Sequence, residues 1–153
     1  MTSKENEMVS VSEIDLETDP NKGNMVILRE NAESDYYLLM FVGDADFAAI
    51  AKEKKLIRPN RPLTHDLYLK ILEFVDLDFL RVEINDMRNE TFYATVFFTL
   101  MGEEHGVDSR PSDAIVIAMN KKIPILVRKN LFRRKLTHKE MQEYEKVVKS
   151  VRF

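Results

Sequence analysis

The stretch GVDSRPSDAIVIAM, residues 106–119, passes from a polar segment directly into an apolar one. Proline suits the first position of a helix, because its missing N–H would have no helical partner there. We therefore expect a helix that begins at Pro111, carries Ser112 and Asp113 in its first turn, and is apolar over 114–119. An acidic residue in that turn complements the positive end of the helix dipole.

The same motif supports three interpretations. A helix start accounts for Pro111, Ser112 and Asp113, but it leaves Asp108 and Arg110 without a role. Free N–H groups beside an arginine form an anion site, in which Arg110 and Ser112 would hold a phosphate. Alternatively, Asp108 and Asp113 offer the hard oxygen ligands that Mg²⁺ or Mn²⁺ prefers. The residues alone leave the structural, anion-binding and metal-binding interpretations open.

A second motif, RPLTHDL at 61–67, also resembles the start of a helix. Thr64 can cap such a helix and Asp66 favours its N-terminus, which leaves His65 with no structural duty. His65 is the strongest candidate for a general acid or base, because the unperturbed pKa of histidine is about 6.5. The chain has three scattered histidines and no cysteine, so it contains no zinc-binding motif of the usual spacing.

The hydrophobic pattern predicts a single compact α+β domain, with a mixed or antiparallel sheet packed against several helices. We expect a β-hairpin whose strands include 80–84 and 92–100, joined by the linker 86–90. In its second strand Phe92 and Phe98 face the core, and Tyr93 lies on the opposite face, free to reach a site. The other expected strands are 8–16, 24–28, 36–42 (buried on both faces) and 123–127. We expect helices over 44–55, from Thr64, and from the capping box Thr137–Glu140. The last helix carries an apolar stripe of Met141, Tyr144, Val147 or Val148, and Val151.

The composition and charge of the chain argue against several classes of function. The 153 residues carry a formal net charge of −3, which argues against broad, charge-driven binding of nucleic acid. No apolar run approaches the roughly 20 residues that span a bilayer, and the first residues lack the features of a signal peptide. We therefore expect a cytoplasmic protein that does not enter a membrane. The four glycines form neither a GxGxxG motif nor a P-loop, so no organic cofactor is expected.

Several segments together resemble one family, the bifunctional nuclease domain. These are RPLTHDL at 61–67, TFYA at 91–94 and DSRPSDAI at 108–115, with MFVGDADFAAIA at 40–51 before them and IPILV at 123–127 after them. The likeness covers residues 8–132, which leaves an acidic N-terminal tail over 1–7 and a C-terminal helical extension over 133–153. Asp46 stands where the family usually has Glu, which shortens that carboxylate by one methylene group.

The resemblance implies a compact α+β domain that forms a homodimer, in a family named for members that degrade both DNA and RNA. Our leading hypothesis is a nuclease that hydrolyses phosphodiester bonds with Mg²⁺ or Mn²⁺. The alternative is a non-catalytic module of the same fold that binds an anionic ligand or a protein partner. The hypothesis assigns His65, Asp66, Asp108 and Asp113 to catalysis, Arg61, Arg110, Ser112 and Tyr93 to phosphate binding, and Asp46, Asp108 and Asp113 to the metal ion.

Overall fold

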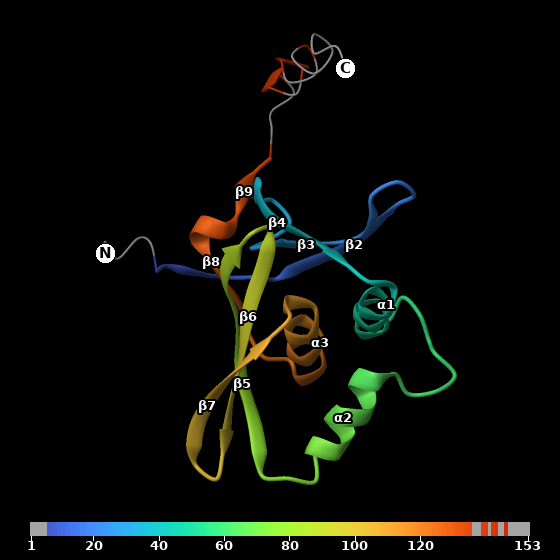
Figure 1. The fold of residues 1–153 in the computed structure, drawn as a ribbon, viewed down its shortest axis with the longest axis vertical. Helices are drawn as coiled ribbons and strands as arrows, with labels where there is room; N and C mark the ends of the chain where they lie inside the picture. Colours follow the sequence, from blue (N-terminus) through green and yellow to red (C-terminus); the bar gives the residue numbers. More distant parts are fainter. Residues whose placement is uncertain (1–5, 136–138, 141, 144–145, 147–153) are drawn as a thin grey trace.

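The structure, a computed structural model, describes residues 6–135, 139–140, 142–143 and 146. Its described part contains two β-sheets and three α-helices, which confirms the α+β class (Figure 1). Most of the acidic tail expected at 1–7 lies outside the described residues. So do Met141, Tyr144, Val147, Val148 and Val151, which form the apolar stripe expected in the last helix.

The larger sheet has five strands in the order β1-β8-β5-β6-β7. The β5–β8 pair is parallel, and the other neighbours are antiparallel. The hairpin turns after β5 and β6 each place two residues at positive φ, Asn89 with Glu90 and Met101 with Gly102. The strands are β1 (Met8–Ser10), β5 (Leu77–Arg88), β6 (Thr91–Leu100), β7 (Glu103–Ser109) and β8 (Ile125–Arg128).

The smaller sheet has four antiparallel strands in the order β2-β3-β4-β9. The last of them is short and pairs only with Tyr36 and Tyr37 at the beginning of β4. Beyond Tyr37, β4 is therefore an edge strand on that side. The strands are β2 (Glu13–Asp19), β3 (Gly23–Arg29), β4 (Tyr36–Val42) and β9 (Arg133–Arg134), the last reached through the short 3₁₀ helix η1 (Lys129–Leu131).

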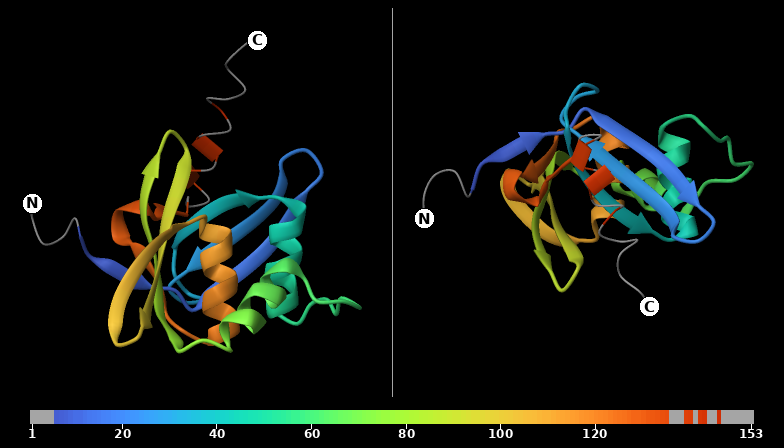
Figure 2. Two further views of the ribbon diagram at one scale, coloured as in Figure 1. Left: turned by 60° about the horizontal axis from the view of Figure 1, so that its bottom comes forward. Right: turned by 90° about the horizontal axis from the view of Figure 1, so that it is seen from above.

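The three helices are α1 (Asp44–Glu53), α2 (Thr64–Leu72) and α3 (Pro111–Lys121), and they lie side by side (Figure 2, left). The helix α3 packs against β5, β6 and α1. A helix that is apolar on all sides belongs in the interior, and every residue from Ala114 to Ala118 is buried. The helix begins at Pro111, as predicted, and it ends where Lys122 adopts a left-handed conformation.

Three strand predictions need correction. The expected strand 8–16 is two strands in different sheets, because the chain crosses between the sheets at Val11 and Ser12. The Val11 N–H donates to Ile125 in the larger sheet, and the Ser12 N–H donates to Arg29 in the smaller one. Only one face of β4 is buried, and Phe41 on the other face is 60% exposed. The expected strands also omitted β7, which contains His105, and the His105 ring stacks on Phe98.

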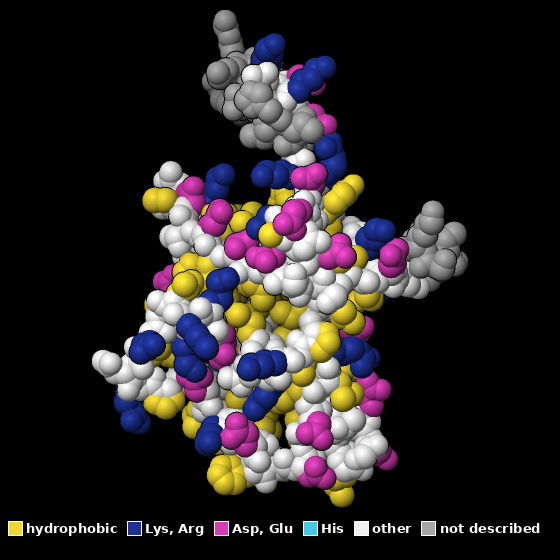
Figure 3. Space-filling view, turned by 180° about the vertical axis from the view of Figure 1, so that it is seen from behind, with side chains coloured by type: hydrophobic (Ala, Val, Ile, Leu, Met, Phe, Trp, Pro, Cys, Tyr) yellow, Lys and Arg dark blue, Asp and Glu magenta, His cyan; other side chains and the backbone are white. Residues whose placement is uncertain are grey.

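Charged side chains of both signs are interspersed around a band of hydrophobic side chains on the face shown in Figure 3. This mixture fits the small net charge of the chain. Within the described residues, no helix has the length and apolar character needed to cross a membrane.

Candidate functional site

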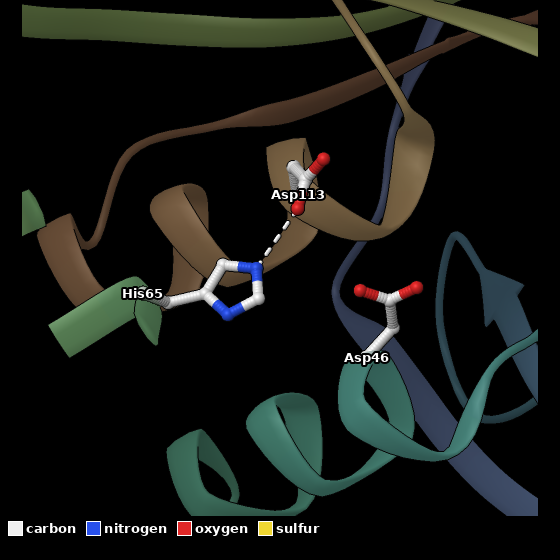
Figure 4. A group of neighbouring side chains, drawn as sticks. All are labelled: Asp46, His65 and Asp113. Atoms are coloured by element: carbon white, nitrogen blue, oxygen red, sulfur yellow. Dashed lines mark hydrogen bonds and ion pairs between the residues drawn. The ribbon is translucent and has the colours of Figure 1, made fainter. Parts of the chain in front are cut away.

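The first turns of the three helices bring three side chains into one cluster. Asp46 comes from α1, His65 from α2 and Asp113 from α3, and Figure 4 shows them pointing toward a common space. One ligand atom from each residue lies within 4.8 Å of the other two. Helix N-termini carry a partial positive charge, which favours the two carboxylates at this place.

A hydrogen bond joins the histidine of the cluster to one carboxylate. His65 Nε2 lies 2.8 Å from Asp113 Oδ1, and the His65 side chain is only 11% exposed. A carboxylate in this position fixes the orientation of the imidazole ring and selects the proton that the ring carries. His65 therefore has a structural partner that its sequence context did not reveal. A histidine and a carboxylate in this geometry can also serve in proton transfer.

Arg110 connects the two carboxylates. Its Nη1 and Nη2 donate to the two oxygens of Asp46, at 3.0 and 3.1 Å. Its Nε and Nη2 donate to the two oxygens of Asp113, at 3.0 and 3.1 Å. Four of the five N–H donors of the guanidinium are thus used, although the side chain is 65% exposed. Asp46, one methylene shorter than the Glu expected there, still reaches Arg110 with both oxygens.

Two side chains at the cluster have raised pKa values. The hydrogen bonds and the negative charge of Asp113 raise the pKa of Arg110, and Asp46 adds to this effect. Burial raises the pKa of Tyr68 to about 12, and the negative charge of Asp113 adds to the shift. The Tyr68 ring centre lies 5.7 Å from that of His65, so a neutral phenol borders the cluster.

Asp66 is engaged outside the cluster. One carboxylate oxygen pairs with Lys52 Nζ, and the other accepts the backbone N–H of Leu63 at 2.8 Å. Burial alone would raise the pKa of Asp66, but these two hydrogen bonds outweigh it and hold the pKa below its usual range. Leu63, not Thr64, is the N-cap residue of α2, so the expected side-chain cap from Thr64 does not form.

The structure does not bring Asp108 or Tyr93 to the cluster. Asp108 pairs with Thr95 across β6 and β7, one residue away from the pair formed by Ser109 and the buried Ala94. Directly opposed residues share a face of a sheet, so Asp108 lies on the face that points away from α3. Tyr93 lies on that same outer face, where the guanidinium of Arg88 covers its ring.

The two remaining candidates lie in different places. Arg61 lines a hollow of about 440 Å³ that it shares with Lys52, Asp66 and Lys70. The buried Ser112 lines a groove of about 710 Å³, together with Asp46 and Arg110. The residues that line this groove do not include His65 or Asp113. Arg110 and Asp46 therefore stand between the groove and the His65–Asp113 pair.

A comparison with known families decides the class of the protein. The model of the bifunctional nuclease domain matches residues 26–140, which include the whole cluster. The chain belongs to this family. The family resemblance found in the sequence is thereby confirmed, and the cluster lies within RPLTHDL, DSRPSDAI and the stretch before them.

Curated relatives of this bifunctional nuclease domain protein come from bacteria and plants. An uncharacterized protein of Mycobacterium tuberculosis strain H37Rv is 37% identical over 108 residues, which are 71% of this chain and 63% of the relative. Bifunctional nuclease 1 of Oryza sativa subsp. indica is 26% identical over 109 residues, 69% of this chain and 33% of the rice protein. A bifunctional nuclease of Oryza minuta matches at the same level. The chain thus spans less than two thirds of each of these relatives.

Proposed function

We propose that this chain is a nuclease that hydrolyses phosphodiester bonds in RNA and DNA at the cluster of Asp46, His65, Arg110 and Asp113. The observation that carries the proposal is the convergence of a histidine–carboxylate pair with an exposed arginine beside a groove. Membership of the bifunctional nuclease domain family and the names of the rice relatives support the same reaction class.

Arg110 is the residue that binds the scissile phosphate in this proposal. A guanidinium holds a phosphate best with two parallel N–H donors, and it keeps its charge at every physiological pH. Because four of its donors already bond to Asp46 and Asp113, Arg110 binds a phosphate by releasing part of this network. The 65% exposure of its side chain leaves room for that movement.

His65 transfers the proton. Asp113 holds its Nε2 and so orients the ring, as a carboxylate does for the histidine of other hydrolytic sites. The imidazole then activates the attacking water or protonates the leaving oxygen, depending on which proton it carries. Because Asp113 engages Nε2, the proton is exchanged at Nδ1, and because His65 does not line the groove, a water carries that proton to or from the substrate.

The cluster also has the ligands for a divalent cation. Asp46 and Asp113 would hold it with one oxygen each, while His65, whose ligand atom lies within 4.8 Å of both, keeps its proton-transfer role. Two carboxylates with water suit either Mg²⁺ or Mn²⁺. The guanidinium of Arg110 bonds to the same carboxylates, so the donor set fits a cation once Arg110 has moved. When bound, such an ion polarises the phosphate and stabilises the charge that develops on it.

One observation favours a non-catalytic anion-binding module as the second candidate. The side chain of Arg61 has no ion-pair partner within the part of the chain that the structure describes, and it lines the hollow that also contains Lys52 and Lys70. Lys52 and Lys70 pair there with Asp66 and Glu73, which leaves Arg61 as the cation of this hollow that can attract an anion without any chemistry at the cluster. Binding of inorganic phosphate that Arg61→Gln abolishes, in a protein that cleaves no nucleic acid, would favour this second candidate.

The nuclease proposal is tested with purified protein on short fluorescent RNA and DNA, in Mg²⁺, in Mn²⁺ or in EDTA. We expect cleavage that requires a divalent cation and disappears in Asp113→Asn. The matched control is Asp78→Asn, because Asp78 is an exposed carboxylate on β5 with no ion pair among the described residues. Cleavage that survives in Asp113→Asn as well as in the control would overturn the proposal.

A further inference from the structure

The groove beside the cluster runs along the free edge of β4. One wall is the edge strand beyond Tyr37, and the opposite wall is the end of the β5–β6 hairpin with the start of α3. Its volume of about 710 Å³ falls in the range of roughly 300–1,000 Å³ that is typical of ligand-binding clefts. The groove continues from the proposed site, because Asp46 and Arg110 line it.

Aromatic and aliphatic side chains make up most of the wall. Phe41 from β4 and Phe92 from β6 line the groove with Met87. Phe41 is 60% exposed and Met87 is 40% exposed, so both offer apolar surface to a ligand. Faces of unpaired nucleobases stack on such surfaces, whereas the bases of a duplex are already stacked on one another.

Arginines mark both ends of the groove. Arg110 lies next to Asp46 at the end where β4 leads into α1, and Arg133 pairs with Tyr37 at the other end. The stretch 38–42 separates the two ends, which at about 3.3 Å per residue is roughly 16 Å. Within the described residues the side chain of Arg133 has no ion-pair partner. Two separated cations flanking an apolar wall match the alternation of phosphates and bases in a single strand.

We propose that this groove binds single-stranded nucleic acid, with bases against Phe41 and Phe92 and phosphates at Arg110 and Arg133. The assignment rests on the proposed function, because it supplies the substrate of the same cluster. Asp46 and Glu90 are the carboxylates that line the groove, and Arg110 neutralises Asp46 but not Glu90. The charge of Glu90, on the opposite wall, weakens the binding of a polyanion. A peptide strand added to β4 would use the free edge but would have no need of the two arginines.

The test measures the binding of a labelled hexanucleotide to the full chain by fluorescence anisotropy, in EDTA so that no cleavage occurs. We expect the single strand to bind more tightly than a duplex of the same sequence. Two phosphate contacts give a slope of about −1.4 for log Kobs against log salt, and Arg133→Gln reduces this slope by about 0.7. Phe41→Ala weakens binding roughly tenfold, and Glu90→Gln strengthens it.

The controls are Arg58→Gln and Phe74→Ala, which remove an exposed arginine and an 87% exposed phenylalanine that do not line the groove. Neither is expected to change binding. Equal affinity for single strand and duplex, or wild-type affinity in Phe41→Ala and Arg133→Gln, overturns the assignment. Absence of binding by either oligonucleotide also overturns it and favours an added peptide strand at β4.

The same variants separate this inference from the proposed function. Binding in EDTA with the expected variant effects, but without cleavage in Mn²⁺, supports the groove and contradicts the nuclease. Cleavage in Mn²⁺ that proceeds at the wild-type rate in Phe41→Ala and Arg133→Gln supports the nuclease and contradicts the groove.

Discussion

Arg110 holds the carboxylate of Asp46 with two hydrogen bonds of 3.0 and 3.1 Å, although the two residues are 64 positions apart. The same guanidinium bonds to Asp113, so a single positive charge compensates the carboxylates that would bind a cation. Arg110 and a divalent cation therefore compete for the same oxygens.

This competition predicts the metal affinity of Arg110→Gln. Removing the guanidinium leaves Asp46 and Asp113 without their cation, so we expect the variant to bind Mn²⁺ at least tenfold more tightly than the wild type, because charge-assisted hydrogen bonds contribute about 1.5–3 kcal/mol each. Titration calorimetry with Mn²⁺ measures the change, and Arg58→Gln serves as the exposed control. Equal affinity in the wild type and Arg110→Gln would show that the cation binds elsewhere or not at all.

Asp66 links stability to pH. Its pKa is lower in the folded protein than in the unfolded chain, so its contribution is present above the unfolded pKa of about 3.9 and is lost as the pH falls through the folded value. We expect Asp66→Asn to lower the free energy of unfolding by about 1–3 kcal/mol at pH 7, because the amide has one acceptor oxygen in place of two and no charge, so it keeps at most one of the hydrogen bonds to Lys52 and Leu63.

The difference between the wild type and Asp66→Asn should shrink steadily below about pH 4, as the wild-type carboxyl takes up its proton. Urea unfolding at a series of pH values measures it, with Asp78→Asn as a control whose stability stays within about 0.5 kcal/mol of the wild type. A difference that is constant between pH 7 and pH 3 would mean that the charge of Asp66 contributes nothing.

Asp108 belongs to the metal site that the motif predicts, but not to the cluster that the fold assembles. The motif pairs it with Asp113, whereas the register with Thr95 places it on the far face of the sheet. We expect Asp108→Asn to bind Mn²⁺ with the affinity of the wild type, and Asp46→Asn to lose at least tenfold. The same calorimetric titration decides, and a loss in Asp108→Asn equal to that in Asp46→Asn would restore the ligand set read from the motif.

The helix α3 and the β5–β6 hairpin could be predicted from the chain because their signals are local. Pro111 followed by an apolar run marks the helix, and alternation from Phe92 to Leu100 marks the strand. The break after Ser10 could not be predicted, because it depends on distant partners: β1 pairs with β8, whereas β2 pairs with β3. The polar edge strand β7 lacks the apolar alternation by which strands are recognised.

The candidate site was predictable as a set of residues but not as a set of contacts. Helix-start chemistry pointed to His65, Arg110 and Asp113, which do lie together. The bond between Arg110 and Asp46 depends on the packing of α1 against α3, which no local pattern encodes. The register of β6 and β7 likewise decides which face Asp108 occupies, and a shift of one residue would reverse it.

The measurement that tests the central claim most directly is the single-turnover cleavage of a fluorescent RNA in Mn²⁺ by His65→Gln. Glutamine can keep a hydrogen bond to Asp113 but cannot exchange a proton at neutral pH. We predict a rate about 10²- to 10⁴-fold below that of the wild type, with a melting temperature close to the wild-type value. Cleavage by His65→Gln at the wild-type rate would contradict the assignment of the cluster as the catalytic site.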